Sequence, residues 1–159
     1  MPGDPTTTQM GLPTAVSLPL SATLGELWVA RTRQHFEDSY AGVRMLQFPE
    51  DLRVFEHLLW LSRPNVVIEI GAQSGGSALW FRDRLRTLRQ YGLKGEVTVI
   101  AIDIDIAPAA EALASADPDF AETITLLEGD VRDPRLPDTV ARRLRRGRGR
   151  VRGHRADAS

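Results

Sequence analysis

The stretch from Val66 to Tyr91 restricts the possible folds of this chain more than any other part of its sequence. It begins with the compact apolar run Val66–Ile70, which is typical of a strand covered on both faces. A loop with three glycines follows, and residues 77–91 then carry apolar side chains at helical spacing. A buried strand that leads through a glycine loop into a helix predicts one unit of a parallel α/β sheet.

Two further strand patterns follow along the chain. Lys94 and Gly95 turn it into a second apolar run over residues 97–102, residues 108–113 have the pattern of a helix, and residues 123–127 that of a third strand. Strands that alternate with helices predict a parallel sheet with right-handed crossovers. The expected fold class is therefore α/β, of the Rossmann-like type.

Two helices are expected before the sheet. The first covers Thr23 to about Ser39, with Thr23 as N-cap and Glu26 completing a capping box. The second begins at Pro49, which suits a first helical turn, and ends at Arg63, because the residue before a proline is disfavoured in a helix. Both patterns have apolar residues on one side, as expected of amphipathic helices with a buried face.

The ends of the chain differ from its centre in composition. Residues 1–22 are rich in Pro, Thr and Gly, which predicts a flexible leader. From Arg142 the chain is rich in Arg and Gly, and residues 142–159 are expected to be a disordered basic tail. Such a tail is consistent with a shifted reading frame or with an arm that binds nucleic acid electrostatically. Residues 23–141 are left as one domain.

Charge and composition exclude several classes of protein. Residues 1–141 hold 12 basic and 20 acidic residues, a net charge of −8, which is a poor match to a nucleic-acid-binding domain. The chain has no cysteine, which excludes disulfides and thiolate metal sites and fits a reducing compartment. No run of 18 apolar residues and no secretory signal pattern occurs, so a cytoplasmic protein without membrane association is expected.

The glycine loop has the spacing G-x-x-x-G-G, formed by Gly71, Gly75 and Gly76. A strand that enters a helix through such a loop presents backbone N–H groups and the positive helix end to a small polar ligand. Glu69 lies two residues before the first glycine, where the G-x-G-x-x-G dinucleotide pattern needs no acid. The alternative is a tight turn that needs glycine only for packing.

Acidic residues follow the other two predicted strands. Asp103 ends the second strand, about 30 residues after the loop, where an acid can accept both hydroxyls of a ribose. Asp130 follows the third strand at the same expected edge of the sheet. Asp105 has the alternative of capping a helix or lying in solvent. Ligands of open α/β sheets bind outside the carboxyl ends of the strands, so the three loops predict one binding crevice.

With these motifs in order, the chain resembles the cephalosporin hydroxylase family, which includes rhamnosyl O-methyltransferases. The resemblance covers roughly residues 40–133 and is carried by Phe48-Pro49-Glu50-Asp51-Leu52, Leu58-Leu59-Trp60, Arg63 through Gly71, and Gly75-Gly76-Ser77-Ala78. It implies a class I methyltransferase that uses S-adenosylmethionine (SAM). It further implies that the methionine end of SAM lies at Glu69, Gly71 and the loop of Gln73, Ser74, Gly75, Gly76 and Ser77, the ribose at Asp103, and the adenine at Asp130 and Val131.

The resemblance implies methyl transfer to a hydroxyl of a sugar or natural product, with antibiotic biosynthesis as a setting and a small molecule as acceptor. Family members use magnesium, held by acids on later strands, and no candidate cluster follows Asp133. We therefore expect a truncated form with weak or no activity and an exposed edge at its last strand, which favours homo-oligomers. The alternatives are a non-catalytic SAM-binding fragment and an NAD-type Rossmann domain. His57 is expected to be a packing or surface residue, and nothing in the sequence places His35 in a substrate pocket.

Overall fold

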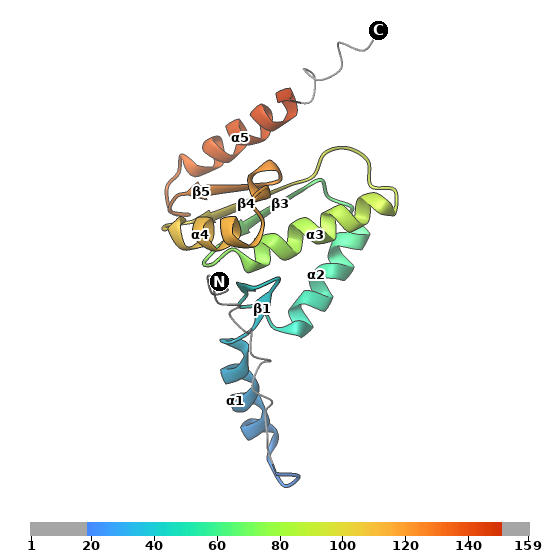
Figure 1. Ribbon diagram of the computed structural model, residues 1–159, viewed down its shortest axis with the longest axis vertical. Helices are drawn as coiled ribbons and strands as arrows, with labels where there is room; N and C mark the ends of the chain where they lie inside the picture. Colours follow the sequence, from blue (N-terminus) through green and yellow to red (C-terminus); the bar gives the residue numbers. More distant parts are fainter. Residues whose placement is uncertain (1–18, 151–159) are drawn as a thin grey trace, which may run out of the picture.

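A computed structural model of the chain describes residues 19–150 (Figure 1). Most of the expected leader, residues 1–18, and the end of the expected tail, residues 151–159, lie outside the described residues. The elements in chain order are α1 (Leu24–His35), β1 (Ser39–Tyr40), β2 (Val43–Arg44), α2 (Pro49–Ser62), β3 (Val66–Ile70), α3 (Gly76–Gln90), β4 (Thr98–Asp103), α4 (Ala107–Ala116), the 3-10 turn η1 (Phe120–Glu122), β5 (Ile124–Glu128) and α5 (Leu136–Arg150).

The centre of the molecule is a parallel sheet with the strand order β3-β4-β5. Val66 pairs with Thr98 and Val99 pairs with Ile124, so the carboxyl ends of all three strands lie at one edge. β1 and β2 form a separate antiparallel pair. The α/β fold with a parallel sheet and flanking helices is confirmed, and the predicted strands are correct to within one residue at each end.

Helices cover both faces of β4. Val99 and Ala101 face the larger core cluster, which includes Leu79 and Leu85 of α3 and Leu113 of α4, all almost fully buried. The alternate residues of β4 belong to a second cluster with α5. Figure 1 shows α3 and α4 on one side of the sheet and α5 on the other.

The first helix is shorter than expected, and its predicted cap is confirmed. The Thr23 hydroxyl accepts from the Glu26 N–H at 3.2 Å, while the Glu26 carboxylate accepts from the Thr23 N–H at 2.8 Å. α1 ends at His35 instead of continuing to Ser39, because the chain turns there into the β1–β2 hairpin. α2 begins at Pro49 as predicted and ends where Arg63 adopts the left-handed conformation, at φ 49°.

The expectation of an irregular, disordered segment from Arg142 onward differs from the structure. The helix α5 begins at Leu136 and continues without a break to Arg150. Its apolar residues Leu136, Val140 and Leu144 recur every four residues and pack on the sheet beside Leu127. The sequence pattern was missed because this period begins upstream of the Arg-rich stretch, and arginine itself is a good helix former.

Truncating Val140 tests the docking of α5 on the sheet. Val140 is 9% exposed within the second core cluster, so Val140→Ala removes buried apolar surface and is expected to lower the free energy of unfolding by about 1.5 kcal/mol. Urea unfolding followed by circular dichroism measures this loss. Alanine is a better helix former than valine, so a variant as stable as the native chain or more stable would contradict the docking of Val140.

The expectation that Val66–Ile70 is covered on both faces is wrong. The apolar surface that the sheet leaves exposed lies on this first strand, whereas it was expected on the last strand. Ile68 and Ile70 of β3 are 49% and 68% exposed, although their register partners Ile100 and Ile102 are 2% exposed. The difference arises because α5 covers the sheet over β4 and β5 but does not reach β3. None of the helices described within residues 19–150 combines the length and hydropathy needed to span a membrane.

Candidate functional site

The glycine loop connects the end of β3 to the start of α3 at the carboxyl edge of the sheet. Gly71 has φ +90° and Gly75 has φ +84°, a region in which residues with side chains are strained. The Gly71 N–H donates to the Ile102 carbonyl at 2.8 Å, which ties the loop to the end of β4. Gly75 is the N-cap of α3, so the loop brings the positive end of that helix to the edge of the sheet.

Glycine is needed at the three positions of this loop for different physical reasons. A Cβ on Gly75 would lie 2.9 Å from the Leu113 side chain, and one on Gly76 would overlap the Arg44 backbone carbonyl. A Cβ on Gly71 would meet no atom within 4 Å. Packing therefore accounts for Gly76, as the alternative reading of the loop proposed, while Gly75 is required both by packing and by its positive φ. Gly71 is required by its conformation and leaves open space at the edge.

Asp103 joins the three loops at this edge. Its carboxylate accepts from the Gln73 N–H at 2.8 Å and from the Ile104 N–H at 2.7 Å, and its carbonyl accepts from the Gly129 N–H at 2.8 Å. The hydrogen bond from the Gln73 backbone lowers the pKa of Asp103 more than any other contact. The predicted convergence of the glycine loop with this acid is confirmed, and the side chain is ionised and partly exposed.

Glu69 is the buried acid of the site. It is 8% exposed on the face of β3 that α3 covers, and its Oε2 atom has no hydrogen-bond partner in the structure. Burial raises the pKa of Glu69 to about 7, the charge of Asp103 adds to this increase, and a hydrogen bond with Ser77 opposes it. Ser77, also 8% exposed, lies in the first turn of α3. A buried carboxyl with one oxygen left unpaired indicates a site that is completed by a ligand.

The loop after β5 lies at the same edge of the sheet, but its acid, Asp130, pairs with Arg132 of the same loop. The Asp130 carboxylate accepts from the Arg132 N–H at 2.8 Å and from the Arg132 guanidinium, which holds the pKa of Asp130 below its usual range. Val131 is 54% exposed. The Arg132 pairing was not expected, although an acid followed two residues later by arginine was a visible signal.

Ile104 is a second residue that the sequence reasoning missed. It follows Asp103 directly and is 73% exposed at the same edge, so the site has a second exposed apolar side chain in addition to Val131. Its position next to a predicted site acid was the available signal. Asp105 has the less specific role considered for it, because its carboxylate accepts from the Ala107 N–H at 3.0 Å in the first turn of α4.

The two histidines before the tail lie outside this edge. His35 is 7% exposed and its ring stacks on Phe48 with centroids 4.1 Å apart. His57 is exposed on α2, in agreement with a packing or surface role. Among residues 19–150, no three His, Cys, Asp or Glu side chains are grouped closely enough to hold a metal ion.

The fold and this edge together define a class of protein. A parallel sheet, a glycine loop after its first strand, a buried acid before that loop and an acid at the end of the next strand are the parts of a Rossmann-like nucleoside-cofactor domain. The family model described as Rhamnosyl O-methyltransferase/CmcI matches residues 32–151. The match covers more than half of the chain, and the chain belongs to this family.

Solved structures of CmcI are similar to this chain. A structure titled as a complex with Mg-SAM is 29% identical with a TM-score of 0.51, over 77% of this chain and 50% of that one. An SAH complex is 29% identical with a TM-score of 0.52 over 76% and 55%, and an apo structure is 28% identical with a TM-score of 0.53 over 76% and 49%. The chain thus spans about half the length of these structures. The comparison with curated proteins gave no match.

Proposed function

We propose that this chain binds SAM at the carboxyl edge of its sheet and belongs to an O-methyltransferase that acts on a hydroxyl of a sugar or other natural product. The observation that carries the proposal is the buried carboxyl of Glu69 beside the first turn of α3, whose Oε2 atom has no hydrogen-bond partner among residues 19–150. Membership of the Rhamnosyl O-methyltransferase/CmcI family supports the reaction class. The titles of related CmcI structures, which print Mg-SAM and SAH, support the cofactor.

Glu69 fits the methionine end of SAM because that end carries an ammonium group. A cation beside Glu69 would pair with its ionised form and supply the missing partner of Oε2. The N-terminus of α3 and the open space over Gly71 fit the carboxylate of the same amino acid group. The loop residues Gln73, Ser74 and Ser77 line this part of the proposed site.

The nucleoside part of SAM fits the residues after β4 and β5. The ionised, partly exposed carboxylate of Asp103 can accept from ribose hydroxyls. Ile104 and Val131 offer apolar surface to the adenine ring, and Asp130 lies at its rim. Together these residues would hold the cofactor from the amino acid to the base.

SAM supplies a methyl group on a sulfonium that is ready for transfer to an oxygen. The described residues bind and orient this cofactor, and none of them is assigned to magnesium. Because the chain spans about half the length of the CmcI structures, we expect the 159-residue chain alone to transfer methyl groups weakly or not at all. Turnover comparable with that of ordinary enzymes, measured with magnesium and sugar acceptors, would contradict this expectation.

Titration calorimetry with SAM, SAH and NAD tests the proposed cofactor. We expect SAM and SAH to bind, because each has an ammonium group for Glu69, and NAD to give no heat of binding. A cofactor that binds only the folded chain also raises its melting temperature, which provides a second readout. Binding of NAD in preference to SAM would overturn the proposal and favour the NAD-type Rossmann alternative.

Asp103→Asn tests the ribose contact. The variant keeps the shape of the side chain but loses its charge, so SAM binding is expected to weaken about 10-fold to 100-fold, because hydrogen bonds to charged groups are stronger than neutral ones. Asp105→Asn is the matched control, since Asp105 lies two residues away and its carboxylate accepts from the Ala107 N–H. Equal losses in both variants would mean that the general negative charge of this edge matters and not a contact by Asp103.

A further inference from the structure

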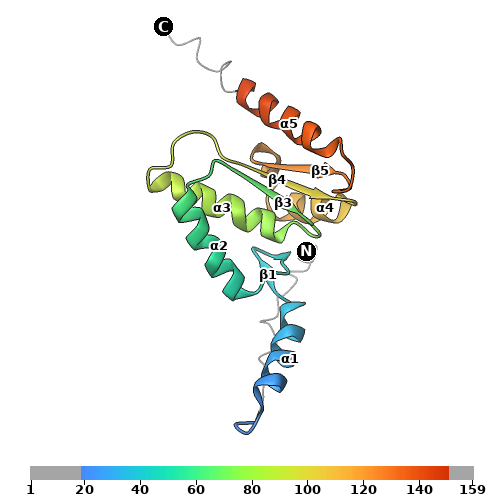
Figure 2. The same cartoon turned by 180° about the vertical axis from the view of Figure 1, so that it is seen from behind.

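The second half of α5 has the densest positive charge of the chain. Residues 142–150 hold six arginines and no acidic residue, whereas residues 1–141 have a net charge of −8. The helix continues through this stretch to Arg150, so these arginines follow one another along a regular backbone. Figure 1 and Figure 2 show α5 on the outside of the molecule, on the opposite side of the sheet from α3.

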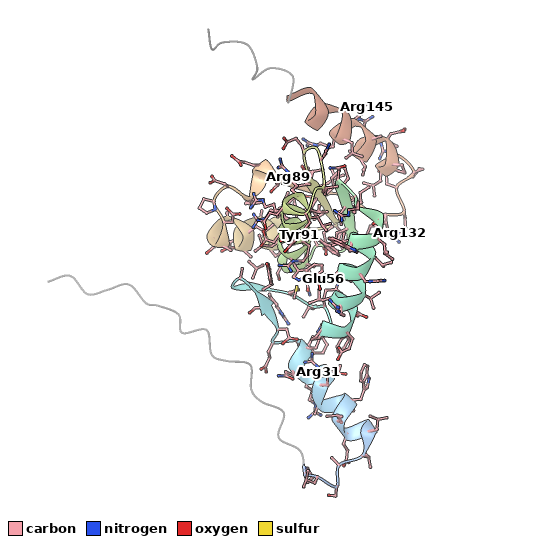
Figure 3. All side chains as sticks on the ribbon, turned by 90° about the vertical axis from the view of Figure 1, so that its right-hand side faces the viewer. Arg31, Glu56, Arg89, Tyr91, Arg132 and Arg145 are labelled. Atoms are coloured by element: carbon pink, nitrogen blue, oxygen red, sulfur yellow. The ribbon has the colours of Figure 1, made fainter. Side chains whose placement is uncertain are left out.

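The basic side of α5 faces away from the sheet. Val140 and Leu144 pack in the second core cluster and hold the other side of the helix against the sheet. In a helix with about 3.6 residues per turn, Arg142 lies opposite both of them, because it is two residues from each. Arg142 and Arg145 are exposed. Figure 3 shows Arg145 at the opposite end of the molecule from Arg31 of α1.

The arginines of α5 differ in their ion pairs from those in the loop before it. Arg132 and Arg135 each pair with an aspartate of that loop. Among residues 19–150, no carboxylate forms an ion pair with Arg142, Arg143 or Arg145. A row of guanidinium groups without such partners fits a polyanion, whose bound counterions are released when the arginines replace them.

The buried apolar side of α5 distinguishes between two kinds of anionic partner. An amphipathic helix binds an anionic membrane by placing its apolar side among the lipids. In α5 this side is already packed on the sheet, with Val140 only 9% exposed. The basic side is left for binding, and it fits the phosphate backbone of a nucleic acid better than a membrane surface.

The shape and composition of α5 favour duplex DNA among the nucleic acids. Residues 129–159 contain no Phe, Trp or Tyr, so this region has no aromatic side chain on which the bases of a single strand could stack. An α-helix with its side chains is about 10–12 Å wide, and the major groove of B-DNA, about 12 Å wide, admits one. The major groove of duplex RNA is too narrow for this approach.

We propose that the basic side of α5 binds the phosphates that flank the major groove of duplex DNA, without reading the base sequence. This contact is separate from the cofactor site, which lies at the carboxyl edge of the sheet. Binding that depends on phosphates alone has a dissociation constant of about 1–100 μM at physiological salt, and we expect this range for the native chain.

Fluorescence anisotropy with the full chain and a short labelled DNA duplex tests the proposal. With about four phosphates contacted, the affinity should fall roughly 150-fold from about 50 to about 200 mM salt, because each contact releases counterions. Duplexes of unrelated sequence should bind equally. Absence of binding at the lower salt concentration would overturn the proposal, and so would an affinity that does not change with salt.

A double variant, Arg142→Gln with Arg145→Gln, tests the assignment to α5. We expect it to weaken DNA binding by more than about 10-fold at low salt and to reduce the slope of log K against log salt by about 2, one for each arginine. Arg86→Gln with Arg89→Gln is the matched control, because both arginines are exposed on α3 and their loss changes the net charge equally. Equal losses in the two double variants would overturn the assignment.

Competition measurements test the choice of partner. Unlabelled duplex RNA and single-stranded DNA should displace the labelled duplex less well than duplex DNA does, and vesicles that contain phosphatidylserine should not bind the chain. A competitor or vesicle bound more tightly than duplex DNA would overturn the proposal. Both double variants should bind SAM as the native chain does, so a failure of DNA binding and a failure of the proposed cofactor site are measured separately.

Discussion

Glu69→Gln is expected to make the folded chain more stable near neutral pH and, at the same time, to weaken SAM binding. The side chain is 8% exposed and its pKa is raised to about 7, so its ionised form is costly in the folded state. A neutral amide of the same shape removes this cost. It also removes the negative charge proposed to pair with the ammonium group of SAM, which should weaken binding about 10-fold to 100-fold.

The direction of the pH effect follows from the raised pKa. Below the ordinary value of 4.5, Glu69 is protonated in both the folded and the unfolded chain. Between 4.5 and about 7 the unfolded chain loses this proton while the folded chain keeps it, so stability falls as the pH rises. The total loss is about 3 kcal/mol at higher pH. In the native chain SAM binding should strengthen over the same range, because the ligand favours ionised Glu69.

Urea unfolding at several pH values measures the stability of Glu69→Gln, and calorimetry measures its affinity for SAM. Glu128→Gln is the control, because Glu128 is exposed at the end of β5 on the same edge of the sheet. If Glu69→Gln bound SAM as tightly as the native chain, the proposed ammonium contact would be wrong. If its stability kept the native dependence on pH, another group would be responsible for that dependence.

Gly76→Ala is expected to lower the free energy of unfolding by about 3 kcal/mol, because overpacking against backbone atoms cannot be relieved by a side-chain rotation. The added Cβ would overlap the Arg44 carbonyl and lie 2.8 Å from the Met45 Cβ. Either β2 or the first turn of α3 must then move. Since that turn carries Ser77 beside Glu69, SAM binding should weaken as well.

Two further glycines separate the causes of this loss, again by urea unfolding. Gly25→Ala lies within α1, with Thr23 Oγ1 the nearest atom at 3.9 Å, and should be neutral or slightly stabilising. Gly92→Ala meets no atom but has φ +91°, so its cost of about 1 kcal/mol reports backbone strain alone. A loss in Gly76→Ala no larger than that in Gly92→Ala would contradict the proposed overlap.

Local sequence patterns predicted the elements of this fold well where burial and local chemistry agree. The apolar run Val66–Ile70 predicted a strand correctly, but the expectation that both of its faces are covered was wrong, because Ile68 and Ile70 are 49% and 68% exposed. The Thr23 cap was predicted correctly because capping depends on residues three positions apart. The same reasoning failed at α5, where the apolar period begins before the Arg-rich stretch that changes the composition. The spacing of Leu136, Val140 and Leu144 indicates this helix, whereas the Arg-rich composition suggested disorder.

The sequence by itself determined the parallel sheet, the glycine loop and the family to which the chain belongs, because these depend on residue types at fixed spacing. Only the tertiary structure decided the surroundings of each site residue. It buried Glu69 with its Oε2 atom unpaired, placed the Gln73 N–H against the Asp103 carboxylate, and explained Gly76 by the Arg44 carbonyl more than thirty residues away. Such contacts join residues that are distant in the chain, and their geometry is set by the packing of whole elements, which spacing does not record.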